Sequence, residues 1–427
     1  MSRKALLNFL LLDSDDDDLE ILTVIAMEEE RLKSEREVVR HRGSVQGRRY
    51  IDRGTILGHE RIFRDYFAEP PVYPPKYFRR RFRMTRSLFL RIQAAVEAHD
   101  PYFVQTRNAA GKLGLSSLQK MTAVMRILAY GVSADFLDEI VRIGESTALE
   151  SLKRFVIAVI EIFSDEYLRS PTSDDIARLL AVGERRGFPG MLGSIDCMHW
   201  KWKNCPTAWK GMYSGHIREP TVILEAVASY DRWIWHSYFG LPGGNNDINM
   251  LERSSVFTEL AQGRAPPANY SINGHNYTMG YYLADGIYPR WSTFVKTIPH
   301  PQGNKKKYFA AAQESARKDV ECAFGVLQAR FAVIRQPARF WGRSMLKVVM
   351  KACIIMHNMI IEDEREDDAQ DFEYERDDGP LPEPVSHEHT TELMEFIRRQ
   401  HVIRNRETHS QLQSDLVEHL WERHSQS

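Results

Sequence analysis

The stretch YYLADGIYPRW, from Tyr281 to Trp291, places an acid at the point where an apolar strand ends. Its first four residues are aromatic or aliphatic and suit a buried strand. Asp285 follows directly, beside a glycine and shortly before Pro289. Asp and Gly are ordinary turn residues, so turn chemistry is one interpretation. A metal ligand held at a rigid strand tip is the other, and the choice between them depends on partner residues.

The segments around this stretch predict a mixed α/β domain. Three strand-like segments precede it: 191–202, 220–230 and 232–240. A helix is expected over 246–260, and Asn273-Gly274 supplies the positive φ angles of a tight hairpin turn. A long helix is expected over about 305–331. With this order, consecutive strands should lie next to one another in one sheet flanked by helices.

Helical periodicity precedes the α/β domain, from Thr85 to about Phe163. The segment SSLQKMTAVMRILAYG predicts a helix with Ser116 or Ser117 as its N-cap and Gly131 as its stop. The segment after it predicts two helices joined by a tight turn at Gly144, which is the helix-turn-helix pattern. Contact with DNA and simple helix packing are both compatible with that pattern.

These patterns divide the chain into five parts. They are an acidic and then basic, weakly ordered region at 1–60, a helical DNA-binding domain at 61–170, the mixed α/β domain at 185–362, an acidic linker at 363–390 and a C-terminal helix at 391–427.

The net charge of −1 hides a strong segregation of charge. Residues 1–30 hold nine acids against two bases, and residues 361–380 hold eleven acids against two. Between them, residues 31–90 hold sixteen Lys and Arg against six acids. A basic segment between acidic ends indicates a polyanionic partner such as DNA. Solvated tails are the alternative interpretation of the acidic ends.

Cysteine spacing and hydropathy exclude several classes of protein. The chain has no CxxC pair and no zinc-like spacing among its four cysteines, Cys197, Cys205, Cys322 and Cys353. A reduced, intracellular protein is the simplest interpretation. No uninterrupted apolar run approaches the roughly 20 residues that a membrane helix needs, so no membrane partner is expected.

Three more acids of the α/β domain occupy special places. Asp196 lies within the first predicted strand, where burying a carboxylate is costly unless something compensates it. Asp247 follows the third strand, and Glu321 lies in the middle of the long helix. Taken singly, Asp247 is a helix N-cap, and Glu321 is a surface residue paired with Arg317 or Lys318.

Taken together, the acids indicate a bound metal. Thirty-five residues separate Asp285 from Glu321, so the helix can fold back over the sheet and bring its acid to the strand tip. Three carboxylates brought together repel one another unless a cation neutralises them. Mg²⁺ prefers oxygen ligands, and two such ions about 3.5–4 Å apart can activate a nucleophile and stabilise a leaving oxygen on phosphorus. The residues therefore predict Mg²⁺- or Mn²⁺-dependent phosphodiester chemistry.

Four long motifs stand in order along the domain: GSIDCMHWKWKNCP, PTVILEAVASYDRWIWHSYFGLPGGNNDINML, INGHNYTMGYYLADGIYPRW and RKDVECAFGVLQARFAVI. With them the chain resembles the transposases of PIF/Harbinger DNA transposons and their domesticated nuclease relatives, particularly the plant-type branch. The resemblance spans roughly residues 60–425. It implies an RNase H-like fold for residues 185–362 and an Asp–Asp–Glu triad whose final gap of 35 residues this chain reproduces.

The resemblance assigns Asp196 and Asp285 as the catalytic aspartates and Glu321 as the catalytic glutamate. Asp247 matches a further acid of the family's PGSxxD-like motif, often a fourth metal ligand. That motif reads PGGNND here, so Gly244 replaces the usual serine. The implied activity is that of a metal-dependent DNA endonuclease or transposase, which cleaves and joins phosphodiester bonds by a two-metal mechanism.

The resemblance also implies partners and a location. DNA is the implied substrate, and a Myb-like accessory protein is the implied partner that brings the nuclease to the nucleus. Without that partner, cytoplasmic location is expected as well. Joining two DNA ends requires a dimer or larger homo-oligomer.

Two other functions compete with an active nuclease. The first is a domesticated, catalytically silent DNA-binding or regulatory protein that keeps the fold. The second is a metal-dependent phosphohydrolase acting on something other than DNA, against which the basic segment and the helix-turn-helix pattern speak.

The residues after the first aspartate allow two interpretations. Trp200 and Trp202 alternate with lysines, which suits stacking and charge along a DNA strand. In a strand, the same alternation puts both rings on one face, which suits core packing. His199 is either a local structural residue or a phosphate contact.

Overall fold

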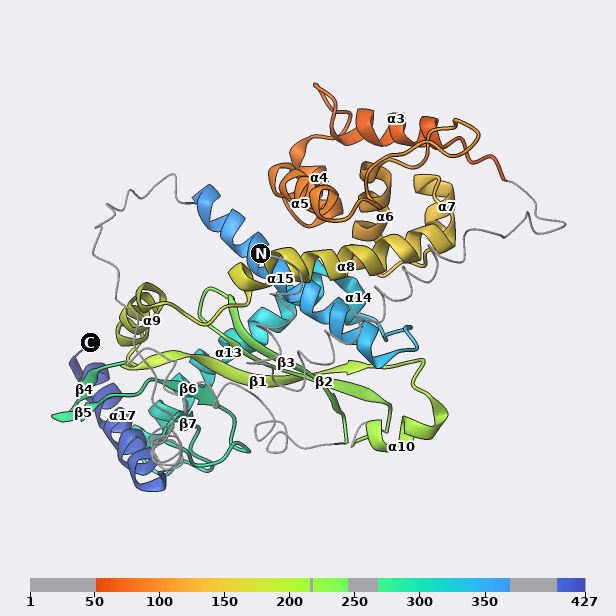
Figure 1. Cartoon of the computed structure of the whole chain (residues 1–427). Helices are drawn as coiled ribbons and strands as arrows, with labels where there is room; N and C mark the ends of the chain where they lie inside the picture. The colour runs from red at the N-terminus through yellow and green to blue at the C-terminus, as the bar shows by residue number, and fades with distance from the viewer. Residues whose placement is uncertain (1–50, 216–217, 245–267, 369–404, 427) are drawn as a thin grey trace, which may run out of the picture. The chain divides into compact units, whose positions relative to one another are not determined.

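The computed structural model describes residues 51–215, 218–244, 268–368 and 405–426 (Figure 1). The described residues form two compact units that alternate along the sequence. Of the described residues, the first unit contains 51–167, 200–215, 218–222 and 326–360, and the second contains 168–199, 223–244, 268–325, 361–368 and 405–426. The predicted helix at 246–260, residues 1–50 and most of the acidic linker lie outside the described residues.

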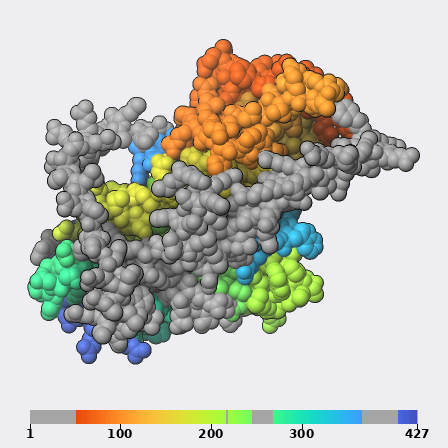
Figure 2. Space-filling model, in the orientation of Figure 1, coloured from red at the N-terminus to blue at the C-terminus, as the bar shows by residue number. Residues whose placement is uncertain are grey.

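Helices build the N-terminal part of the first unit, which Figure 2 shows in red, orange and yellow. In chain order they are α3 (Thr55–Tyr66), α4 (Pro75–Phe82), α5 (Arg86–His99), α6 (Ser117–Tyr130), α7 (Phe136–Val141) and α8 (Glu145–Tyr167). The helices from Arg86 onward are those that the periodicity predicts, whereas two helices precede the predicted region. Helix α6 is the centre of this part, because twelve of its fourteen residues are buried.

The ends of α6 follow from its sequence. The Ser116 hydroxyl accepts a hydrogen bond from the Gln119 N–H at 3.2 Å, and the Gln119 side chain accepts one from the Ser116 N–H at 3.3 Å. This reciprocal pair is a capping box. Gly131 ends the helix at a φ of 66°, a left-handed conformation that favours glycine. The prediction of a cap at Ser116 and a stop at Gly131 is confirmed.

The predicted helix pair around Gly144 is present as α7 and α8. Helix α8 carries an acid, Glu145, in its first turn, and Glu150 pairs with Arg154 at 2.7 Å one turn later. Acids at this end of a helix repel DNA phosphates. Eleven residues of α8 are buried. These features favour the packing interpretation, and DNA contact by this pair stays a prediction.

The first unit also contains short helices and the long helix α15 (Arg343–Asp368). The short ones are η2 (Thr207–Trp209), α10 (Lys210–Tyr213) and α14 (Ala332–Arg335). Over Arg343–Arg365, α15 is long and apolar enough to span a membrane, alone among the described helices, yet 83% of its most apolar window is buried inside the fold. Its His357 and Asn358 are fully buried, and the Asn358 amide donates to the Tyr167 carbonyl at 2.8 Å. These are the properties of a core helix.

A five-stranded sheet forms the centre of the second unit. Its strands are β1 (Met191–Lys201), β2 (Thr221–Ala228), β3 (Ile234–Pro242), β6 (Tyr281–Ala284) and β7 (Phe294–Lys296), in the order β3-β2-β1-β6-β7. Strand β6 is parallel to β1 and to β7. Strands β2 and β3 are joined by a short turn closed by a 3.1 Å bond from the Ser229 N–H to the Trp233 carbonyl, so they run antiparallel. The predicted mixed α/β fold, with helices flanking the sheet, is confirmed. The expectation that consecutive strands are neighbours holds for β1, β2 and β3, but β6 pairs with β1 and not with β3.

The predicted hairpin forms a separate two-stranded sheet of β4 (Tyr270–Ile272) and β5 (His275–Tyr277). At its turn, Asn273 has a φ of 50° and Gly274 a φ of 83°. Both central residues therefore adopt the positive φ that the Asn-Gly pair predicts.

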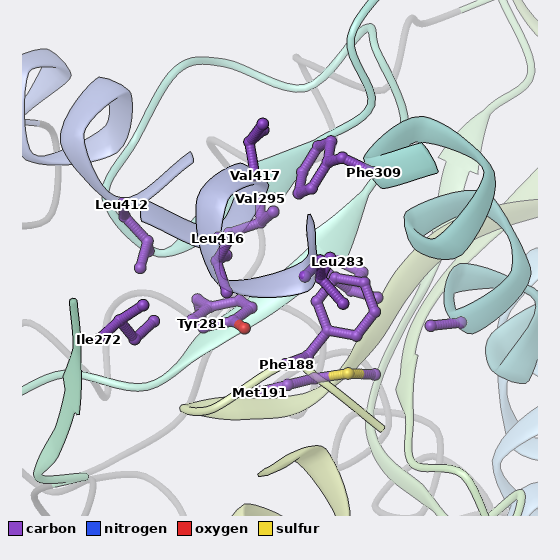
Figure 3. Close-up of a cluster of buried hydrophobic side chains, with 12 residues drawn as sticks. Phe188, Met191, Ile272, Tyr281, Leu283, Val295, Phe309, Leu412, Leu416 and Val417 are labelled. Carbon is purple, nitrogen blue, oxygen red and sulfur yellow. The ribbon is translucent and has the colours of Figure 1, made fainter. Parts of the chain in front are cut away.

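Three helices complete the second unit: α9 (Ser173–Arg185), α13 (Asn304–Arg330) and α17 (Arg406–Gln426). Figure 3 shows Leu412, Leu416 and Val417 of α17 pointing into a buried cluster. Strands β6 and β7 supply Tyr281, Leu283 and Val295 to the same cluster. The last helix of the chain thus covers apolar residues of the strands that precede Asp285 and follow it.

Candidate active site

The pairing of β1 with β6 brings two of the predicted acids together. The parallel register pairs Gly193 with Tyr282 and Ser194 with Leu283. Continuing it by two residues puts Asp196 level with Asp285. Neighbouring strands lie about 4.8 Å apart, so the two carboxylates share one edge of the site.

Helix α13 is fixed to this edge by buried polar contacts. The Gln313 side-chain amide donates to the carbonyls of Ala284, at 3.1 Å, and Val295, at 3.0 Å, which lie on β6 and β7. The Ser194 hydroxyl of β1 donates to the Ala316 carbonyl at 3.3 Å. Figure 1 shows α13 running beside these strands. The helix is therefore tied to the three strands whose residues frame the site.

Glu321 lies on the same face of α13 as Gln313, because positions 313, 317 and 321 follow at one-turn intervals. Arg317 fills the position between them. Its Nη1 lies 3.0 Å from Asp196 Oδ2, and its Nη2 lies 3.0 Å from Glu321 Oε1. One guanidinium therefore bridges the strand acid and the helix acid.

The electrostatics of Asp196 show that the acids interact. Burial raises the pKa of Asp196 above its ordinary value, and the charges of Glu321 and Asp285 raise it further. A hydrogen bond from the Cys197 N–H, at 2.8 Å, and the charge of Arg317 act in the opposite direction. Asp285 and Glu321 thus both lie within electrostatic reach of Asp196.

Asp285 also does the turn chemistry that its sequence allows. Its Oδ1 accepts from the Gly286 N–H at 2.5 Å, and its carbonyl accepts from the Tyr288 N–H at 3.2 Å. Its second carboxylate oxygen is in none of these bonds. The two interpretations of this acid are therefore compatible with each other.

Carboxylate oxygens such as those of Asp196, Asp285 and Glu321 are the ligands that a hard divalent cation prefers. In this structure the guanidinium of Arg317 binds two of these carboxylates. Among the described residues, no three His, Cys, Asp or Glu side chains are grouped closely enough to hold one ion. The carboxylates of Asp196 and Glu321 instead share Arg317, a cation that lies between them. These two carboxylates supply oxygen atoms of the kind that Mg²⁺ and Mn²⁺ prefer, and in this structure the guanidinium of Arg317 occupies the position between them.

Sequence reasoning missed two residues beside the acids. Gln313 orients α13, and its signal in the sequence is a polar residue two turns before Glu321 on the same helical face. Lys296 ends β7, and its side chain donates to the Tyr288 carbonyl. Burial lowers the pKa of Lys296, whereas the nearby charge of Asp285 raises it. Nothing in its local sequence distinguishes it from other strand-end lysines.

The other residues considered from the sequence fall into three groups. Trp200 and Trp202 are buried and donate to the carbonyls of Gln336, at 2.9 Å, and Phe340, at 2.8 Å, so core packing is the correct interpretation. His199 is exposed. Asp247, the predicted fourth metal ligand, lies outside the described residues, and its role stays a prediction.

Comparison with known proteins shows which family this site resembles. A family model described as plant transposon protein matches residues 165–368, a range that includes Asp196, Asp285 and Glu321. Residues 165–368 are therefore similar in sequence to the plant transposon protein family. The resemblance drawn from the motifs is thereby confirmed, and the candidate site lies wholly within the plant transposon domain.

Further similarities extend beyond the plant transposon domain. Protein ALP1-like from Arabidopsis thaliana is 23% identical over 315 residues, which cover 69% of this chain and 73% of that protein. A model for a domain of unknown function matches residues 58–97, in the helical part. No solved structure matches the chain.

Proposed function

We propose that this protein is a metal-dependent DNA endonuclease or transposase of the Harbinger type, with an RNase H-like catalytic domain. The proposal rests on one observation above all. The register of β1 and β6 sets Asp196 level with Asp285. On α13, Glu321 shares the guanidinium of Arg317 with Asp196. The sheet, with three consecutive strands followed by two parallel ones, supports the proposed fold.

In this proposal each acid has a defined task. Asp196 and Asp285 hold divalent cations from neighbouring strands, Glu321 completes the site from the helix, and Asp247 is the proposed fourth ligand. When bound there, Mg²⁺ or Mn²⁺ would neutralise the acids and stabilise charge on a phosphodiester. Gln313 keeps the helix in register with the strand ends, so that the acids stay positioned.

The proposed reaction is in-line attack on a DNA phosphodiester by water and then by a DNA 3′-hydroxyl. No side chain is required as a covalent nucleophile, because positioning and charge neutralisation supply the catalysis. A homo-oligomer that joins two DNA ends, a Myb-like accessory partner and a nuclear location belong to the same proposal.

A silent, domesticated DNA-binding protein is the second candidate, and Arg317 is the observation that favours it. An arginine that already bridges two of the acids neutralises part of the site without metal. The two candidates differ in whether the bridge opens when metal and DNA bind.

A plasmid-nicking assay distinguishes the two candidates. The full chain is incubated with supercoiled plasmid and Mg²⁺ or Mn²⁺, with and without a Myb-like partner, and EDTA provides the blank. Nicking that EDTA abolishes supports the nuclease. DNA binding without nicking under every one of these conditions supports the silent protein.

Arg317→Met is expected to tighten Mn²⁺ binding by about fivefold or more in the absence of DNA, because it removes a cation that competes with metal for the carboxylates. The measurement is the free Mn²⁺ concentration, followed by electron paramagnetic resonance during titration. Lys318→Met is the matched control, because Lys318 is an exposed neighbour with the same charge. Weaker binding by Arg317→Met would mean instead that the arginine holds the acids in place for metal.

A further inference from the structure

The helical part contains a cavity of about 510 Å³ that the proposed chemistry does not use. Residues from α3, α4, α6 and α7 line it, and its polar lining is dominated by arginine and tyrosine: Arg61, Arg81, Arg126, Tyr66, Tyr73 and Tyr130. Its volume lies within the range of roughly 300–1,000 Å³ that is typical of small-molecule sites.

Arg126 is an unusual residue to find in α6, the most buried helix of this part. Its Nη1 donates to the Arg81 carbonyl at 2.7 Å, and its guanidinium lies 4.7 Å from the centre of the Phe82 ring. Burial lowers the pKa of Arg126 below its ordinary value. The fold therefore holds this charge at a desolvation cost that its neighbours do not fully offset.

Arg81 points at the same place from α4. Its guanidinium lies 4.0 Å from the centre of the Tyr73 ring, and it donates to the Tyr66 hydroxyl. Arg126 also donates to that hydroxyl, at 3.3 Å. Two guanidiniums thus converge on one phenol oxygen at the wall of the cavity.

In the described part of the chain, these two arginines have no acidic partner. Among the described residues, neither Arg81 nor Arg126 forms an ion pair, and Asp65 is the single acid in the cavity lining. Part-buried arginines elsewhere in the chain do have carboxylate partners: Arg154 with Glu150, Arg178 with Asp231, and Arg317 with Asp196. In this cavity two part-buried positive charges thus lie close together without a carboxylate partner among the described residues.

We propose that this cavity binds one nucleotide of single-stranded or frayed DNA. The phosphate contacts Arg81 and Arg126, because guanidinium forks match phosphate oxygens. The base lies against Tyr130, since bases stack on aromatic rings without regard to sequence. The Tyr73 ring is already covered by the Arg81 guanidinium and stacked on Tyr66. Inorganic phosphate alone would leave the aromatic and apolar lining unfilled. The proposal goes beyond the nuclease function, and it holds whether or not the chain cleaves DNA.

Calorimetric titration of the full chain in EDTA tests the proposal, because EDTA removes any contribution from metal at the carboxylates. A deoxynucleoside 5′-monophosphate is expected to bind at least about tenfold more tightly than either the matching nucleoside or inorganic phosphate. Arg81→Met is expected to weaken nucleotide binding by about tenfold or more. Arg80→Met is the matched control, because Arg80 is an exposed arginine on the same helix outside the cavity.

A second variant keeps the test independent of the arginine's structural role. Ile140 lines the cavity and is 40% exposed, so Ile140→Trp is expected to fill the space without unfolding the helix. It should abolish nucleotide binding while leaving both arginines in place. Phosphate binding as tight as nucleotide binding, equal losses in Arg81→Met and Arg80→Met, or binding of a Glu-rich peptide in place of nucleotide would each overturn the proposal.

Discussion

Asp196→Asn is expected to reduce metal-dependent plasmid nicking by at least about a hundredfold while leaving DNA binding intact. The amide removes the negative charge of Asp196, which interacts electrostatically with Arg317, Glu321 and Asp285. Asp285→Asn and Glu321→Gln are expected to have the same effect. The measurement is the initial nicking rate in Mg²⁺, with binding followed separately by fluorescence anisotropy of labelled DNA.

The thermal stability of Asp196→Asn is the measurement that separates lost catalysis from unfolding. Because burial raises the pKa of Asp196, the folded state disfavours its charged form. The contribution of Asp196 to the free energy of unfolding therefore falls as the pH rises from the ordinary pKa of an Asp to the raised pKa of the folded state. At neutral pH the Asn variant should unfold at a temperature no lower than the wild-type protein.

Asp174→Asn is the matched control for these acids, because Asp174 is exposed in the first turn of α9, outside the site. It should nick DNA at the wild-type rate. Unimpaired cleavage by Asp196→Asn or Glu321→Gln would remove the basis for the proposed nuclease.

Leu416→Ala is expected to lower the free energy of unfolding by about 2–5 kcal/mol. Leu416 is fully buried in α17, and its side chain lies in the cluster formed with Tyr281 and Leu283 (Figure 3). Truncating it removes apolar contacts and leaves a cavity beneath β6. Urea unfolding followed by circular dichroism measures the change.

Ser414→Ala is the control on the same helix, since Ser414 is exposed and should change stability by less than about 0.5 kcal/mol. A loss below about 1 kcal/mol in Leu416→Ala would mean that α17 contributes little to the core of the second unit. A large loss in both variants would indicate a general effect on the helix and not on the cluster.

Features set by local chemistry were predictable from the sequence. The cap at Ser116, the stop at Gly131 and the turn at Asn273-Gly274 each depend on residues within a few positions of one another. The placement of acids at a strand end and mid-helix was also readable, because periodicity separates strands from helices. That Asp196 and Asp285 lie on neighbouring strands was implied only by the family resemblance, and the register that sets them level is visible only in the structure.

Features set by distant contacts were not predictable. Whether Trp200 and Trp202 face DNA or the core is decided by carbonyls at Gln336 and Phe340, more than a hundred residues away. Helical spacing predicts Glu321 as the partner of Arg317, and this ion pair is present. The same guanidinium also binds Asp196 on β1, which is distant in the sequence. Periodicity cannot supply such long-range pairings.

The position of α17 has a consequence for how related gene copies should be judged. This helix lies beyond residues 165–368, the range matched by the plant transposon family, yet it covers the strands that precede and follow Asp285. A copy with a premature stop before Arg406 would retain every acid of the proposed triad and lose the cover over β6. Screening genomes for working copies by their acidic residues alone would therefore count such damaged genes as intact.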